Sequence, residues 1–355
     1  MISKFSKLIR TIREFNLNFF FKLFFIFLKR NYSKYPNYVK DFEFLLSKKF
    51  NSKHCLTFSS GTAAFYASLI SLNLKKNSKI LISSLTFPSV IKTLKKFDFN
   101  IHYFDIDKNF EIISKNIKDQ KFDLLVMTYP YGFYINHEIL KTHLNKDAKT
   151  ILDASHSQGM KINNIDHVNF FDISFISLQG NKAISGGEGG IILTDDESLY
   201  FKMINNHHPG HSKNNNPDIA GGINDLKLRM HPIAALIATN DLKSFEKRNQ
   251  ILKNKIKIIY DYLEKLGVKH PFNLNTTLSG FHFGIPFFSP HKIQSDIIKN
   301  YNWYPNLSLL NLNSISQENN EIFFKDLHFI DLEWIKNNNI SGIKKKISLI
   351  FKNAS

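Results

Sequence analysis

Residues 177–190 read SLQGNKAISGGEGG, and this stretch shapes both the expected fold and the expected chemistry. It begins at the end of one apolar run, DISFIS, and leads into another, GGIILTDD. Lys182 therefore lies on a glycine-rich connection between two expected strands. A lysine held beside a buried sheet edge can have its pKa lowered by desolvation and by nearby positive charge, and a neutral amine can attack carbonyl carbons. Most lysines are simply solvated, so the neighbouring motifs must decide between these interpretations.

Short apolar runs alternate with helical periods on both sides of this stretch. We expect strands at residues 55–60, 79–84, 100–106, 122–130, 150–155, 172–178 and 189–196, and helices at 39–50, 61–74, 89–97 and 232–266. In the first of these helices, Phe42, Leu45, Leu46 and Phe50 are predicted to share one face. The alternation predicts an α/β fold with a mostly parallel central sheet that is covered on both faces.

The chain divides into three expected parts. Residues 1–35 form a basic, Phe-rich, helical arm, residues 36–245 a large α/β domain, and residues 246–355 a smaller C-terminal α+β domain. The length of 355 residues and a hydrophobic content of 43% suit a large folded core rather than a disordered chain.

Charge and cysteine content exclude some classes of function. The net charge is +17, but the lysines are scattered and no nucleic-acid recognition motif accompanies them, so we expect no nucleic-acid partner. The single cysteine, Cys55, rules out a disulfide framework or a thiolate metal site within one chain, and we expect no metal. One cysteine also favours a reducing compartment, the cytoplasm.

The first 32 residues carry seven cations and one anion. Their apolar part, Phe19 to Leu28, is interrupted by Lys22 and is shorter than the roughly 20 apolar residues that a spanning helix needs. Lys29 and Arg30 follow it where a signal peptide would have small residues. Two interpretations stay open: the arm packs on the protein body or a partner subunit, or it makes peripheral contact with a membrane interface.

Two polar motifs follow expected strands. SSGTAA, residues 59–64, lies between a strand and a helix, where free backbone N–H groups and the helix dipole favour an anion, and Gly61 permits close approach. Thr62 can add a hydroxyl, although Ser or Thr at this place is often only a helix cap.

ILDASHSQG, residues 151–159, ends a strand with Asp153, a carboxylate that is costly to bury without a cation. His156 follows it; the plain alternative is a capping Asp with a surface His.

A third motif is TFPS, residues 86–89, in which Phe87 could present its ring to a planar ligand or could be a core residue. An anion cradle, a strand-end carboxylate, an aromatic face and a Schiff-base lysine are together what pyridoxal 5'-phosphate requires. Five motifs in order, SSGTAA, TF, DASHSQG, the serine-to-GGEGG stretch with its lysine, and RMHPIAA, resemble the DegT/DnrJ/EryC1/StrS family of sugar aminotransferases of fold type I. The resemblance runs from about residue 36 to 260.

The resemblance implies roles for the residues that act on the cofactor ring. Lys182 is similar to the lysine that binds the cofactor covalently through its amine. Once released, that amine carries a proton between the substrate carbon and the C4′ carbon of the cofactor. Asp153 resembles the partner of the pyridine nitrogen, which keeps this nitrogen protonated. His156 matches the position against the ring and its phenolic oxygen, and Phe87 the one that stacks on the other face.

The resemblance also implies phosphate ligands and a quaternary arrangement. Thr62, Ala63 and Ser177 are similar to the groups that hold the phosphate, beside Gly61. The family often has Asn two residues before the Arg of RM; Lys227 stands there, and we expect it to reach the phosphate of a neighbouring subunit. A homodimer with a shared active site is implied.

The implied reaction moves an amine from an amino acid, by family habit L-glutamate, to a keto-sugar that is usually nucleotide-linked, for amino-sugar and surface-polysaccharide biosynthesis. Some family members have His in place of the lysine and remove a hydroxyl; Lys182 favours amine transfer. Residues 270–355 carry no sugar-binding pattern that we can identify. Two alternatives therefore stand: the same chemistry on a cyclitol or other cyclic ketone, and a non-catalytic scaffold on an aminotransferase body.

Overall fold

The computed structural model describes residues 19–21, 24–25, 36–107, 111–113, 117–207, 226–268, 284–289, 295–299 and 327–352. The amino-terminal half begins with α3 (Pro36–Phe50), β1 (His54–Phe58), α4 (Gly61–Leu72), β2 (Lys79–Ser83), α5 (Pro88–Leu94), β3 (Asn100–Ile106) and β4 (Ile112–Ile113). It continues with β5 (Phe122–Thr128), α6 (Glu138–Lys141), β6 (Leu144–Asp153), the hairpin β7 (Lys161–Ile162) and β8 (Ile165–Asp166), and β9 (Ile173–Ser177). Then come β10 (Gly190–Thr194), α7 (Glu197–His207) and the long α8 (Pro232–Lys265).

Eight strands form one sheet in the order β1-β10-β9-β6-β5-β2-β3-β4. The five neighbouring strands β9, β6, β5, β2 and β3 pair in parallel, whereas β10 is antiparallel to both β1 and β9, and β4 pairs antiparallel at the edge. The predicted class, a mostly parallel α/β sheet of fold type I, is confirmed. The predicted strands and the four predicted helices are all present, with ends shifted by a few residues.

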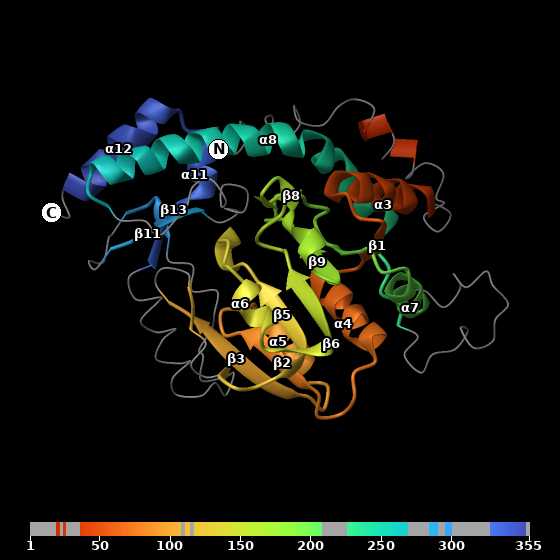
Figure 1. Cartoon of the computed structure of the whole chain (residues 1–355). Helices are drawn as coiled ribbons and strands as arrows, with labels where there is room; N and C mark the ends of the chain where they lie inside the picture. The colour runs from red at the N-terminus through yellow and green to blue at the C-terminus, as the bar shows by residue number, and fades with distance from the viewer. Residues whose placement is uncertain are drawn as a thin grey trace.

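The central strands are buried on both faces, and alternate residues serve two cores. In β2, Leu81 packs into one core while Ile80 and Ile82 pack into the other. The first core is closed by α3 and α8 and the second by α4, α5 and α7 (Figure 1). This explains why the strands read as continuous apolar runs rather than as polar–apolar alternation.

Helix α3 shows where a simple period overstates burial. Phe42, Leu46 and Phe50 are fully buried at a four-residue spacing, as expected. Leu45 was expected beside them but is 37% exposed. It lies one turn of the helix from Phe42 on the flank of the buried stripe, because the residues spaced by four already fill the contact with the body.

The carboxyl-terminal part has a small antiparallel sheet, β11-β13-β12, of β11 (Gly284–Phe288), β12 (Ile298–Lys299) and β13 (Leu327–Asp331), followed by α11 (Leu332–Asn337) and α12 (Ile340–Lys352). Helix α12 packs against α8, which runs along the top of the molecule from the α3 side to the C-terminal sheet (Figure 1). Because α8 is continuous across residues 245 and 246, the domain boundary predicted there falls within one helix, and it stays a prediction.

Only five residues of the predicted arm 1–35 are described, and all five are helical. Phe19 is buried against Leu236 and Tyr38, which joins this segment to the starts of α8 and α3. Phe20, Phe21, Phe24 and Phe25 are 42–56% exposed. Within the described ranges, no helix combines the length and the apolar character that crossing a membrane requires.

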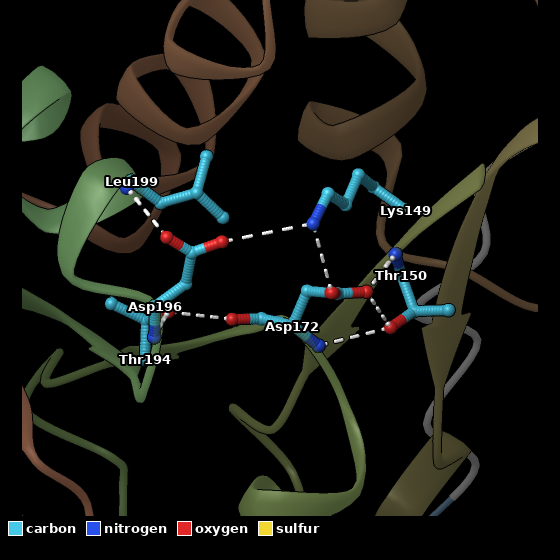
Figure 2. A network of polar contacts seen from close by, with 6 residues as sticks. All are labelled: Lys149, Thr150, Asp172, Thr194, Asp196 and Leu199. Atoms are coloured by element: carbon cyan, nitrogen blue, oxygen red, sulfur yellow. Dashed lines mark hydrogen bonds and ion pairs between the residues drawn. The ribbon is translucent and has the colours of Figure 1, made fainter. Parts of the chain in front are cut away.

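The amino-terminal edge of the parallel strands is closed by a polar network (Figure 2). The Asp172 carboxylate accepts from the Thr150 backbone N–H at 2.8 Å and hydroxyl at 2.7 Å, and Lys149 lies between Asp172 and Asp196 at 3.3 and 3.7 Å. Asp196 also caps α7, since its Oδ1 accepts from the Leu199 N–H at 3.0 Å. A cavity of about 150 Å³ lies beside this network, but these carboxylates already have structural partners. We assign them a structural role.

Candidate active site

The sequence motifs meet at the carboxyl edge of the sheet. Phe58, the last residue of β1, pairs with Gly190, and Gly190 pairs in turn with Ser177, the last residue of β9. Asp153 ends β6, the parallel neighbour of β9. Carboxyl ends of parallel strands are where open α/β sheets place their ligands, and this edge brings three of the four motifs together.

Close backbone approach fixes the start of α4 against the sheet. A Cβ atom on Gly61 would lie 2.8 Å from the Cβ of Ser177, and one on Gly190 would lie 2.2 Å from the carbonyl oxygen of Ser60. Ser60 is the N-cap of α4, and its hydroxyl accepts from the Ala63 N–H at 3.0 Å. The helix start therefore lies directly beside Ser177, but the Ala63 N–H is already used by the cap.

Thr62 and Phe87 lie at the rim of this edge. Thr62 is exposed, and its hydroxyl donates to the Ser89 hydroxyl at 3.2 Å, which ties the first turn of α4 to the first turn of α5. Phe87 is the N-cap residue of α5 and its side chain is 40% exposed, so it is not one of the core phenylalanines. Both side chains are accessible to a ligand.

Asp153 is buried, and its Oδ1 accepts from the Ser155 N–H at 2.9 Å. Burial raises the pKa of its carboxyl group above the ordinary value, and the bond from Ser155 and the charge of Lys182 act against this rise. The Ser155 hydroxyl accepts from the Ser177 N–H at 2.9 Å. The carboxylate is thus fixed between the ends of β6 and β9.

Lys182 lies on the connection between β9 and β10, and its backbone N–H donates to the Gln179 carbonyl at 2.9 Å. Burial lowers the pKa of its amine to about 8, with the Asp153 carboxylate acting in the opposite direction. The two groups are thus close enough to interact electrostatically. The charge that acts on the amine is negative, whereas the sequence interpretation expected a positive one. An amine with this pKa has an appreciable neutral, nucleophilic fraction at neutral pH.

His156 is buried near Tyr131, at a ring-centroid distance of 6.4 Å. Its Nδ1 accepts from the Tyr131 backbone N–H at 3.4 Å, so in the neutral ring the proton is on Nε2. Tyr131 has a left-handed backbone with φ of 56°, and its ring contacts Phe329 of β13 at 4.7 Å. Tyr131 therefore fixes the orientation of the His156 ring and at the same time contacts the C-terminal sheet through Phe329.

Lys227 is exposed on the segment that precedes α8. The next residue, Leu228, accepts at its carbonyl from the Ser59 N–H at 2.6 Å, and Arg229 forms a bridge with Phe58. The segment therefore runs beside the end of β1 and the turn into α4. Its role toward a neighbouring subunit stays a prediction.

Two residues at this edge escaped the sequence interpretation. Tyr131 gave no signal, because its left-handed backbone cannot be read from a YPYG sequence. Gln158 lies within DASHSQG but was given no role; it is fully buried, and its side chain connects Ser177 to Ile184. The signal available in the sequence was that Gln158 belongs to a polar run directly after an apolar strand.

Comparison with protein families matches residues 26–296 to the DegT/DnrJ/EryC1/StrS aminotransferase family. The chain belongs to this family. The resemblance inferred from five motifs is confirmed, as are the pyridoxal phosphate-dependent enzyme class and cofactor at the level of the family.

Among the relatives of this family member, GDP-perosamine synthase of Escherichia coli O157:H7 is 25% identical over 47% of this chain and 48% of its own length. GDP-4-keto-6-deoxy-D-mannose 3-dehydratase of Escherichia coli O55:H7 is 26% identical over 47% of this chain and 46% of its own length. The matched part spans about half the length of these curated relatives. A solved E. coli GDP-4-keto-6-deoxy-D-mannose-3-dehydratase with bound hydrated PLP has a TM-score of 0.74 at 17% identity, covering 95% of this chain and 96% of that one.

Proposed function

We propose that this family member is a pyridoxal phosphate-dependent aminotransferase that moves an amine from an amino acid, L-glutamate, to a nucleotide-linked keto-sugar. The observation that carries the proposal is the placement of the Lys182 amine near the buried Asp153 carboxylate, with Lys182 on the β9–β10 connection and Asp153 at the end of β6. A sugar aminotransferase provides amino sugars for surface polysaccharides, which is the biological role we propose.

The residues at the edge fit the cofactor. A buried carboxylate with a raised pKa lacks a fully compensating cation, which a protonated pyridine nitrogen provides. The start of α4, pressed against Ser177 at Gly61, offers a helix terminus to the phosphate. Thr62 and Ser177 would add hydroxyls to it, and Phe87 would lie on one ring face. Because the Ala63 N–H bonds to Ser60, we propose that any contact from Ala63 to phosphate requires a shift of this cap.

When bound, the cofactor withdraws electrons from the substrate carbon that bears the amine. Lys182 is the residue that would hold the cofactor, through its neutral amine. At pH 7.5, a pKa of about 8 leaves roughly a quarter of this amine neutral, against about one in a thousand at 10.5. The Lys182 amine would also be the group that takes a proton from the substrate carbon and returns one to it, as general base and general acid.

Asp153 and His156 would hold the ring rather than move protons at carbon. Asp153 would keep the ring nitrogen protonated by its charge, and the Ser155 N–H keeps the carboxylate in place. His156, with its proton on Nε2 and its Nδ1 fixed by Tyr131, can donate to the phenolic oxygen. Burial of both side chains excludes water from the back of the site.

For the acceptor, we propose a GDP-linked 4-keto-6-deoxy sugar as the first compound to test. Curated relatives of two kinds carry names with GDP-linked sugars, perosamine synthases and 3-dehydratases. Lys182 favours amine transfer over removal of a hydroxyl. A cyclitol or another cyclic ketone is the alternative acceptor, and it would use the same catalytic residues.

A direct assay separates these possibilities. Purified protein with pyridoxal phosphate and L-glutamate is offered GDP-4-keto-6-deoxymannose, then other nucleotide-linked keto-sugars and cyclic ketones, and amino product is detected by mass spectrometry. We expect product with a nucleotide-linked keto-sugar and none from Lys182→Ala. Turnover of cyclic ketones alone would show that the acceptor is a cyclic ketone and not a nucleotide-linked sugar. Cofactor binding without any turnover would favour a non-catalytic scaffold.

We further propose a cytoplasmic homodimer whose basic arm, residues 1–32, lies against an anionic lipid interface. Phe19 anchors the described part of the arm, while Phe20, Phe21, Phe24 and Phe25 are exposed. The sequence of residues 1–32 carries seven cations and one anion. Such a charge excess disfavours contact between two arms and favours anionic lipid.

Sedimentation with vesicles tests the arm. Replacing these four phenylalanines by Ser should abolish binding to phosphatidylserine vesicles, whereas Phe201→Ser, an exposed residue on α7, should retain it. Binding to neither anionic nor neutral vesicles by the unaltered protein would contradict the lipid proposal, and a change of mass in ultracentrifugation on replacing the four residues would assign this face to a second copy instead.

A further inference from the structure

The three residues that directly follow Lys182 are each held at a backbone group by a different side chain. The Ala183 carbonyl accepts from Arg248 Nη2 at 3.1 Å, the Ile184 N–H donates to Gln158 Oε1 at 2.6 Å, and the Ser185 N–H donates to Asp241 Oδ2 at 2.9 Å. The backbone beside Lys182 is therefore restrained by side chains from distant parts of the chain.

Gln158 joins this connection to the sheet. Its Nε2 donates to the Ser177 carbonyl at 2.9 Å while its Oε1 accepts from Ile184. Only one orientation of the amide satisfies both bonds, because a carbonyl can only accept and an N–H can only donate. The side chain is fully buried, so losing either bond leaves a desolvated polar group unpaired. Gln158 thus bridges the connection from Ser177, before Lys182, to Ile184, after it.

Asp241 and Arg248 form the second restraint, from two turns of α8. Arg248 Nη2 lies 2.8 Å from Asp241 Oδ1 and 3.0 Å from the Asp241 carbonyl oxygen. The pair orients both side chains, which leaves the second carboxylate oxygen for Ser185 and the guanidinium for Ala183. Both side chains are partly exposed, so the ion pair itself contributes little free energy. Its role is to hold the two side chains in the orientation that reaches Ser185 and Ala183.

The connection needs restraint because of its composition. Residues 178–189 contain four glycines, which leave the backbone many conformations. The lysine stem adds further rotational freedom. An amine that is free to turn into water would regain full solvation and leave the vicinity of Asp153.

We propose that Gln158 and the Asp241–Arg248 pair are positioning residues that hold the Lys182 amine in its partly buried place beside Asp153. This inference rests on the proposed function for its catalytic meaning, but the placement itself is a property of the protein without cofactor. None of the three residues is expected to contact substrate or the reacting atoms.

The test measures the Lys182 amine in cofactor-free protein. Lysines are reductively methylated with ¹³C-formaldehyde, and the Lys182 signal is identified by its loss in Lys182→Arg and titrated by NMR. In Asp241→Ala we expect its pKa to rise from about 8 toward 10.5, because burial is the main cause of the low value. Asp241→Asn, whose amide oxygen can still accept from Ser185 although the contact of Oδ1 with Arg248 is lost, should restore part of the original titration. Lys243→Ala, an exposed position on the same helix, is the matched control.

Gln158→Leu and Arg248→Lys provide independent variants if Asp241→Ala fails to fold, and both should move the titration in the same direction. An unchanged Lys182 titration in every folded variant would overturn the proposal, even where the protein is less stable. The proposed function is judged separately: if unaltered protein transfers amines but the titration does not move, positioning fails while the function stands. If no cofactor binds but the Lys182 titration moves, the positioning role stands and the proposed function fails. In active protein, we expect kcat to fall at least about 10-fold in Asp241→Ala with little change in KM.

Discussion

The Asp153 carboxylate and the Lys182 amine, which come from different strand ends, lie close enough for each charge to shift the pKa of the other. In both groups burial is the larger effect, and it favours the neutral form. Burial therefore disfavours both charges of the pair. The amine loses its proton more easily than a solvated lysine, and a cationic ligand would stabilise the carboxylate. This combination suits a lysine that must act as a nucleophile while an acid group binds a ring nitrogen.

Asp153→Asn separates the two roles. Asn can still accept from the Ser155 N–H, so we expect the fold to persist. The Asp153 charge raises the pKa of Lys182, so its removal should lower that pKa below about 8 in cofactor-free protein. Turnover should fall at least about 100-fold, because the ring nitrogen loses its charged partner. NMR titration and steady-state kinetics measure the two effects, and an upward move of the Lys182 titration would be inconsistent with this placement.

Gly190→Ala tests the close approach that fixes the phosphate-binding turn. The new methyl group would meet the Ser60 carbonyl oxygen at 2.2 Å, a backbone atom that cannot rotate away. We expect the free energy of unfolding in urea to fall by more than about 2 kcal/mol. Gly180→Ala is the matched control, because its Cβ would meet only the Gly187 carbonyl at 3.8 Å, and it should change stability by less than about 0.5 kcal/mol. Equal effects at the two glycines would refute this packing.

Glu43 makes stability depend on pH. Burial raises the pKa of its carboxyl group from 4.5 to about 7, although its carboxylate accepts from the Thr57 N–H and hydroxyl at 2.8 Å each. Between these values the folded chain binds more protons than the unfolded chain, so the contribution of Glu43 to the free energy of unfolding decreases as pH rises from 4.5 to 7. Relative to the unaltered protein, Glu43→Gln should become more stable over this window, by about 3 kcal/mol at pH 8.

Urea unfolding at several pH values measures this difference. Thr57→Val should raise the pKa of Glu43 further, because it removes one hydrogen bond that stabilises the carboxylate. The pH range over which stability decreases should then extend to higher pH. A constant difference between Glu43→Gln and the unaltered protein from pH 5 to pH 8 would contradict the assignment.

The sheet could be predicted because its strands are buried on both faces, so that runs such as those containing Ile80–Ile82 are continuously apolar. The site could be predicted because parallel strands place their carboxyl ends on one edge, which brings Asp153 and Ser177 together. The resemblance to a known family then supplied roles that residue chemistry alone left open.

Other features depend on long-range contacts that no local pattern encodes. Asp241 and Arg248 look like ordinary charged residues of an amphipathic helix, and only the folded structure brings them to Ser185 and Ala183. The exposure of Leu45 likewise depends on which side of α3 meets the body. The cap bond at Ala63 shows that a helix start can be used internally before any anion arrives.

The central claim is that the Lys182 amine holds the cofactor, and covalent trapping tests it most directly. Protein is incubated with one equivalent of pyridoxal phosphate, reduced with borohydride, digested and mapped by mass spectrometry. We expect one pyridoxyl adduct, on Lys182, that is absent from Lys182→Arg and still present in Asp153→Asn. No adduct, or an adduct on other lysines that survives Lys182→Arg, would contradict the claim.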